Sequence, residues 1–264
     1  MAAKKNVPAA PAKREVAVPT NTDLAMFAAH GGTGFDEGID AGAYALPFLS
    51  ILQGLSPAVQ RGTPEYIEGA APGMIINTVT KQLFDEVFVS VVRRTHTLCR
   101  WNSRDAGGGF LGEQEAHIAA MQAFGMLPRD DKGRSIDSEG KEVTEHRNFY
   151  CQVLHEEGHQ EPALISMSRS QLKHARNWNT LIGLKSAKGA NGQPVSTSEI
   201  WRLTTQLQKN KKGEQWYGWA VAHYDRHSDA AVFAQVTEAV TFAKSQSNVQ
   251  RQLEHIEEPA TGDM

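Results

Sequence analysis

Residues 200–224 carry the pattern that most constrains how this chain folds. Apolar and polar side chains alternate over residues 200–207, a basic turn follows at residues 209–213, and residues 215–224 form a second run that is rich in aromatic residues. Strict alternation is typical of a strand with one buried face, and two such runs around a short glycine-containing turn predict an antiparallel hairpin. The segment therefore favours a β protein over a helical bundle.

Other strand-like segments precede this hairpin. Residues 45–53 and 73–79 are apolar runs bounded by Gly or Pro, and residues 87–101 begin with several β-branched side chains. Residues 148–154 and 163–167 flank a turn with a glycine and predict a second hairpin. Strands that follow one another through turns pair antiparallel. We therefore expect a mainly β protein with appended helices, built on an antiparallel barrel of five or six strands.

The remaining segments predict helices and polar extensions. Helical spacing occurs over residues 113–124, over residues 169–181 behind Ser168 as N-cap, and over a long amphipathic C-terminal helix at residues 229–252. Residues 1–22 predict a disordered basic arm, residues 23–253 one domain, and residues 254–264 a disordered acidic tail. Within the domain, residues 129–146 are polar and predict a mobile insertion.

The charge distribution points to a polyanionic partner more clearly than the net charge does. The chain has a formal charge of −3, yet residues 169–219 contain nine Lys or Arg and two Glu, a net charge of +7. Such segregation places a basic face on an acidic protein. The two cysteines, Cys99 and Cys151, form no C-x-x-C pair, which excludes a disulfide scaffold and disfavours a thiolate zinc site. No signal peptide or apolar span is present, so we expect a soluble protein in the cytoplasm, that of the host cell if a phage encodes it.

One motif suggests metal chemistry. His155-Glu156-Glu157-Gly158-His159 matches the H-E-x-x-H pattern of zinc metallopeptidases, in which a helix places both histidines on one face. Here the flanking segments alternate as strands, Gly158 lies inside the motif and Pro162 follows it. Because Gly and Pro oppose a helix at this point, we expect a hairpin turn without tightly bound zinc. A zinc hydrolase that uses His155, Glu156 and His159 stays open as an alternative.

No other pattern supports an enzyme. The run Gly107-Gly108-Gly109 lacks the G-K-[ST] ending of a phosphate loop and the spaced glycines of a dinucleotide fold, and the chain has no G-x-S-x-G. We therefore expect no catalytic residues, no metal and no cofactor.

Basic residues interleaved with aromatic rings are the stronger functional signal. Proteins that bind single strands combine cations along the phosphates with rings that stack on unpaired bases. The last hairpin must bury one of its faces, and we expect Tyr217 and Trp219 inside and Trp216 outside. The candidate binding residues are Arg93, Arg94, Arg100, Trp101, Lys173, Arg176, Trp178, Lys209, Lys211, Lys212 and Trp216.

Several segments resemble a known family. They are residues 46–53 with Ser56-Pro57, residues 66–70 and 77–80, Trp101 with residues 107–110, residues 165–173 through Trp178-Asn179, and Trp216-Tyr217-Gly218-Trp219 before a helix and an acidic tail. Together they are similar to single-stranded DNA-binding proteins of tailed bacteriophages, over residues 45–264.

The resemblance implies an oligonucleotide-binding (OB) barrel that protects and presents single-stranded DNA in phage replication and recombination. It also implies contacts of the tail with replication or recombination proteins of the phage or host, through Glu254, Glu257, Glu258 and Asp263. The tail ends in Gly262-Asp263-Met264, whereas tails of such proteins often end in an aromatic residue, which puts partner recruitment in doubt. The insertion at residues 129–146 is also longer than the barrel requires.

Two alternatives and several properties stay open. The first alternative is a protein–protein module, either an inhibitor of a host enzyme or a minor structural phage protein, and the second is the zinc hydrolase. The sequence does not decide between DNA and RNA, because aromatic stacking serves both nucleic acids. It also leaves open the site size and whether the protein forms a homo-oligomer.

Overall fold

The computed structural model describes residues 45–102, 107–155, 158–230 and 232–237. The N-terminal arm, the acidic tail and the C-terminal helix beyond residue 237 lie outside these residues. The described chain is mainly β with antiparallel pairing and few helices, which confirms the expected class. Within these residues, no helix has the length and apolar character to cross a membrane.

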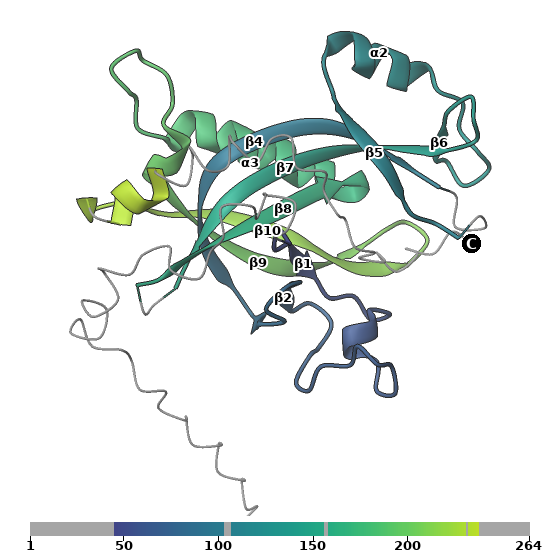
Figure 1. Ribbon diagram of the computed structural model, residues 1–264, viewed down its shortest axis with the longest axis horizontal. Helices are drawn as coiled ribbons and strands as arrows, with labels where there is room; N and C mark the ends of the chain where they lie inside the picture. Colours follow the sequence, from purple (N-terminus) through teal and green to yellow (C-terminus); the bar gives the residue numbers. More distant parts are fainter. Residues whose placement is uncertain (1–44, 103–106, 156–157, 231, 238–264) are drawn as a thin grey trace, which may run out of the picture. The chain divides into compact units, whose positions relative to one another are not determined.

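Seven strands form the main sheet, in the order β10-β9-β4-β7-β6, with β5 paired to β4 and β8 paired to β7 (Figure 1). The strands are β4 (Val87–Trp101), β5 (Phe110–Glu115), β6 (Ser135–Ile136), β7 (Glu142–Leu154), β8 (Gln160–Ser168), β9 (Glu199–Lys209) and β10 (Gln215–Arg226). The two long strands β4 and β7 pair along almost their whole length and hold the sheet together. Both hairpins expected from the sequence are present, as β7–β8 and β9–β10.

A second sheet of three short strands lies between the two sides of the main sheet. It consists of β1 (Leu49–Ile51), β2 (Ile75–Asn77) and β3 (Leu83–Phe84). Phe48 forms one parallel bridge to Leu164 of β8. At the other side, the Gln53 side chain accepts from the Tyr217 backbone N–H and donates to its carbonyl, both at 2.9 Å. The Gln53 side chain therefore occupies the backbone groups at the edge of β10 with which another strand could pair. The described strands form no closed barrel.

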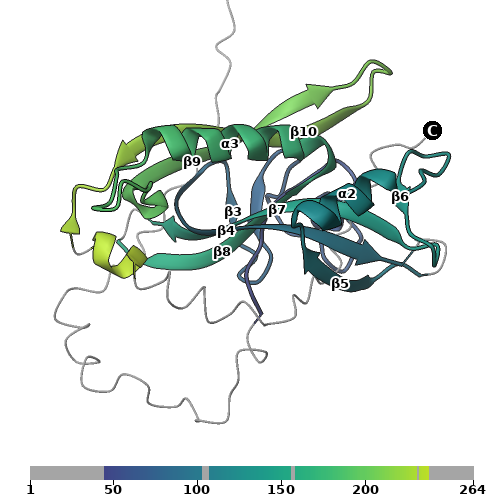
Figure 2. The same ribbon diagram turned by 90° about the horizontal axis from the view of Figure 1, so that it is seen from above.

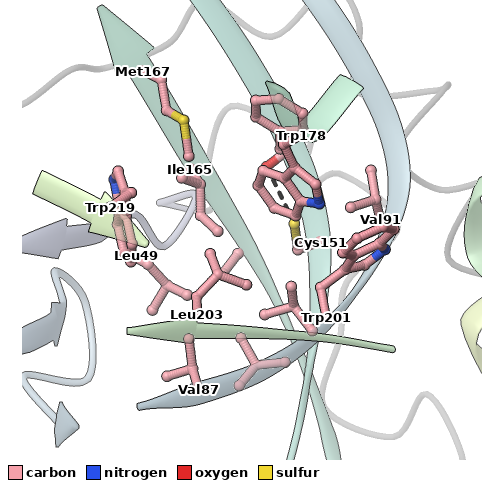
Figure 3. Close-up of a cluster of buried hydrophobic side chains, with 14 of the residues drawn as sticks. Leu49, Val87, Val91, Cys151, Ile165, Met167, Trp178, Trp201, Leu203 and Trp219 are labelled. Atoms are coloured by element: carbon pink, nitrogen blue, oxygen red, sulfur yellow. Dashed lines mark hydrogen bonds between the residues drawn. The ribbon is translucent and has the colours of Figure 1, made fainter. Parts of the chain in front are cut away.

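Helix α3 (Leu172–Lys185) covers the buried face of the main sheet (Figure 2). It follows the 3-10 turn η4 (Arg169–Gln171), and the other short helices are η2 (Pro57–Val59), α2 (Ile118–Met126) and η5 (Ser196–Ser198). Figure 3 shows the core that forms beneath α3, where Trp178 and Trp201 lie among aliphatic side chains of β4, β8 and β9. Trp178 stacks on Phe149, with ring centroids 4.1 Å apart.

A β-bulge in β4 decides which way two neighbouring arginines point. Val91 is opposite Cys151, and the register shifts before Arg93, so that Arg94 is opposite Phe149. Because Cys151 and Phe149 are core residues, Arg94 continues the face that α3 covers. Arg93 instead lies over the Tyr150 ring, 5.5 Å from its centroid.

One type of tight turn recurs at residues 130–134, 137–141, 155–159, 189–193 and 210–214. In each, the N–H of the first residue donates to the carbonyl of the fifth, and the fourth residue is a glycine whose N–H donates to the carbonyl of the first. The glycines have φ between 74° and 93°, which favours glycine over other residues. Two of these turns and β6 lie within residues 129–146. The expected polar insertion therefore contains regular hydrogen-bonded structure although it has little apolar surface, and its mobility stays a prediction.

Candidate nucleic-acid interface

Two arginines and a histidine surround one buried carboxylate where α3 crosses β4 and β7, and a third arginine on β4 bonds to α3 nearby. Glu145 is 7% exposed, and its oxygens lie 2.9 Å from His96 Nε2, 3.3 Å from an Arg147 nitrogen and 3.6 Å from an Arg176 nitrogen. Arg94 joins the group through a 3.0 Å hydrogen bond to Asn179 of α3. We call Arg94, His96, Arg147 and Arg176 the arginine cluster.

The arginine cluster carries excess positive charge. Burial lowers the pKa of His96, the nearby Arg147 lowers it further, and Glu145 opposes the shift. His96 is therefore neutral at neutral pH, and the arginine cluster contains three guanidinium groups beside one carboxylate, which Arg147 and Arg176 contact. Arg176 is 61% exposed, so an anion in solvent can reach it. A group of guanidiniums with an excess over carboxylates favours oxyanions such as phosphate, because each planar guanidinium can donate two parallel hydrogen bonds to two of the oxygens.

The first turns of α3 connect the arginine cluster to the β9–β10 hairpin. The side-chain amide of Gln208 on β9 donates to His174 Nε2 at 2.8 Å. Lys173 is exposed beside His174, and the first turn of α3 contains no acidic residue, so the positive end of the helix dipole is not compensated there. The hairpin then exposes three lysines. We call the arginine cluster, Lys173, His174, Lys209, Lys211 and Lys212 the basic track.

The aromatic residues of β10 divide between the core and the basic track. Trp219 is 3% exposed, which confirms that it faces inward. Tyr217 is partly buried next to Gly73, where a Cβ atom would lie 2.6 Å from the ring. Trp216 is partly exposed and is opposite Gln208 in the strand register, so it lies beside the basic track.

Trp178 is not a surface residue. It is 0% exposed, stacks on Phe149 and packs edge-on against Trp201 at 6.2 Å. A fully buried ring has no free face for a base, so the expectation that Trp178 binds nucleic acid is corrected. It shares one helix face with Ala175 and Ile182, both also buried.

Three other expected residues lie apart from the basic track. Arg100 is on the same face of β4 as the arginine cluster but is neutralised by Asp137 at 2.5 Å and Glu139 at 2.8 Å. Trp101 packs edge-on against Phe110, with centroids 5.3 Å apart. Arg93 lies on the opposite face of β4, over Tyr150.

Sequence reasoning missed His96 and Arg147. The two residues are directly opposite each other in the β4–β7 pairing, 51 positions apart in the chain. Neither is next to an aromatic residue in the sequence, so the search for adjacent basic and aromatic residues passed over both. Their relationship depends on the pairing of β4 with β7 and on the bulge, which no local pattern reveals.

The described residues of the H-E-x-x-H segment lie in the connection between β7 and β8, as expected, while Glu156 and Glu157 lie outside the described residues. The His155 N–H donates to the His159 carbonyl at 3.1 Å, and Gly158 has a φ of +86°. The helical arrangement of a metallopeptidase is therefore absent, although the two imidazole rings lie parallel, with centroids 4.0 Å apart.

Comparison with known proteins gives one match. The model of a family described as "Pam3 phage gp34-like protein" matches residues 12–250. No curated protein and no solved structure matches the chain. The description of the family includes a phage but no activity, so it supports the phage part of the resemblance noted from the sequence.

Proposed function

Starting from the fact that this chain belongs to the Pam3 phage gp34-like protein family, we propose that it is a non-enzymatic protein that binds single-stranded DNA during phage replication or recombination. The basic track is the observation that carries this proposal. It joins cations from β4, β7, α3 and the β9–β10 hairpin through the Gln208–His174 hydrogen bond and the shared carboxylate of Glu145.

The charge balance of the basic track favours a polyanion. Seven Lys or Arg residues belong to it, while Glu145 and Glu214, which is in the hairpin turn, are the nearby carboxylates. Neutralising phosphates releases counterions and supplies most of the affinity of sequence-independent binding. The cations are distributed over several secondary-structure elements. This distribution suits an extended nucleic-acid strand better than a small anion.

Trp216 supplies a reason for single strands. Its partly exposed ring lies beside the basic track, and unpaired bases stack on such rings with about 1–3 kcal/mol each. Bases of a duplex are already stacked on one another, so the Trp216 ring cannot stack on them. The arrangement of cations along a curved antiparallel sheet with a nearby ring is compatible with an OB-like mode of binding.

A paired substitution tests the site. Arg147→Gln combined with Arg176→Gln removes two charges of the arginine cluster, and oligo-dT affinity should fall at least tenfold at low salt. Arg202→Gln is the control, because Arg202 is also exposed and ion-paired, at 2.5 Å from Glu86, but has no recorded contact with the residues of the basic track. Equal losses in both variants, or none in the double variant, would contradict this interface and favour the protein–protein module.

A further inference from the structure

The turn between β7 and β8 brings two imidazoles and a carboxylate together. Glu161 Oε2 lies 3.5 Å from His155 Nε2, and Glu161 Oε1 lies 3.7 Å from His159 Nε2. The two rings stack with an interplanar angle of 10°. Ligand atoms of the three residues all lie within 4.8 Å of one another. The carboxylate therefore reaches both imidazoles at once.

The backbone of the turn explains why the histidines meet. His155 and His159 are the first and fifth residues of the recurring turn, and two other copies of this turn also place the side chains of these positions together. Arg134 lies 2.8 Å from Asp130, and Asn210 hydrogen-bonds to Glu214. A helix is thus not the only backbone that places residues four apart side by side. A metal site at His155 and His159 therefore does not require the helix that Gly158 and Pro162 oppose.

One imidazole nitrogen is left without a hydrogen bond. His155 Nε2 is buried and has no hydrogen-bond partner among the described residues. The His155 side chain is 11% exposed, and the Phe84 ring lies 6.2 Å from its own. The 3.5 Å separation from Glu161 is longer than the usual range of about 2.7–3.2 Å for N–H···O bonds. A buried polar atom without a partner is unfavourable, and a ligand at this point would remove the penalty.

We propose that His155, His159 and Glu161 bind one divalent transition-metal ion of the zinc type, with the stacked imidazole rings turning so that both in-plane nitrogen lone pairs point at the ion. Imidazole nitrogen and carboxylate oxygen bind Zn²⁺ at about 2.0–2.2 Å, which puts neighbouring donors of a tetrahedral site about 3.3–3.5 Å apart. The two nitrogen–oxygen distances of 3.5 and 3.7 Å are close to that spacing. Water can take the fourth position. The ion would fasten the end of the β7–β8 hairpin.

This site differs from the metallopeptidase pattern that the sequence suggested. Its third ligand is Glu161 on β8, and its backbone is a hairpin. The proposal concerns metal binding alone and includes no hydrolytic step. It does not depend on nucleic-acid binding, because the two imidazoles and the carboxylate are not part of the basic track.

Calorimetric titration of the EDTA-treated full chain with Zn²⁺ tests the site, with the visible absorption of Co²⁺ as a second probe. The wild type should bind one equivalent of each ion. His159→Ala and Glu161→Gln should weaken binding at least about tenfold, since each removes a direct ligand. His117→Ser is the matched control, because it removes an imidazole from another turn and leaves an oxygen to cap α2.

The change in the thermal unfolding midpoint on adding Zn²⁺ distinguishes residues that bind the metal from residues that only support the turn. Zn²⁺ should raise the midpoint of the wild type and of His117→Ser, because a ligand of the folded state stabilises it. It should have little effect on His159→Ala and Glu161→Gln. The proposal is overturned if the wild type binds neither ion stoichiometrically, or if both ligand variants bind Zn²⁺ with the wild-type affinity.

Discussion

Gln208 near the end of β9 donates a 2.8 Å hydrogen bond to His174 of α3, which is 34 positions earlier in the chain. Burial lowers the pKa of His174, and neighbouring Lys173 lowers it further, which keeps the accepting nitrogen unprotonated at neutral pH. The contact joins the lysines of the β9–β10 hairpin to the cations of α3. The basic track therefore depends on tertiary structure as well as on a local run of lysines.

Glu145→Gln tests the electrostatic role of the arginine cluster. Removing the carboxylate that Arg147 and Arg176 share leaves their charges available to phosphate. Two unit charges at 4 Å interact by about 1 kcal/mol in water, so oligo-dT affinity should rise about fivefold at low salt. Fluorescence titration measures the change, and Glu86→Gln serves as a control carboxylate that pairs with Arg202 on a different surface. Unchanged or weaker binding by a folded Glu145→Gln protein would contradict the account.

Trp216→Ala tests stacking. Loss of the ring should weaken binding to oligo-dT by about 1–3 kcal/mol while the salt dependence stays nearly unchanged, because no charge is removed. Titrations at several salt concentrations separate these two effects. If this variant binds like the wild type, the ring of Tyr217 becomes the stacking candidate.

Trp178→Ala should instead lower the free energy of unfolding by about 3–5 kcal/mol, because it empties a fully buried site.

Three histidines make stability sensitive to mild acid. Burial is the main cause that lowers the pKa of His96, His174 and His227 below the ordinary 6.5. The unfolded chain therefore binds more protons than the folded one as the pH falls through about 6.5, so the folded state loses stability. Urea unfolding midpoints should be lower at about pH 5.5 than at about pH 7.5, a window above the titration of most carboxylates. His227→Gln should reduce this difference, and a midpoint that rises on acidification would contradict the assignment.

Removal of residues 254–264 tests the tail, which lies outside the described residues. The segment has four acidic residues and no basic one, so it can compete with DNA for the basic track. Truncation should tighten oligo-dT binding at low salt, and the gain should shrink as salt screens exposed charges over about 10 Å at 0.1 M. Weaker binding, or no change at low salt, would rule out the competition.

Local patterns predicted the elements better than their assembly. Alternation and turn glycines predicted the β7–β8 and β9–β10 hairpins, and helical spacing predicted α3. The expected N-cap was wrong, because Ser168 makes no capping hydrogen bond and α3 begins at Leu172 after a 3-10 turn. The spacing of Ala175, Trp178 and Ile182 also contained the information that Trp178 is a core residue. The adjacent Lys173 and Arg176 had suggested a surface role, which shows that neighbours in a helical sequence need not share a face.

Long-range pairing is what the sequence did not reveal. The bulge between Val91 and Arg93 decides which of two adjacent arginines points to the face of the arginine cluster, and the pairing of β4 with β7 brings His96 opposite Arg147. The expected barrel also required two edge strands to pair with each other. At the edge of β10, the side chain of Gln53 forms the hydrogen bonds that a strand would form in a barrel. Such relationships depend on register and on contacts between distant segments, which residue periodicity does not determine.

Fluorescence titration of the full chain with oligo-dT and with a duplex of equal length, each at low and high salt, tests the central claim most directly. We expect sequence-tolerant binding that is tighter for the single strand and weakens steeply with salt, with a slope of about −0.7 per phosphate contact. Charge reversal of Lys209, Lys211 and Lys212 should flatten that slope by about 2, because three such contacts are lost. Equal affinity for both nucleic acids, or binding to neither at low salt, would contradict the account.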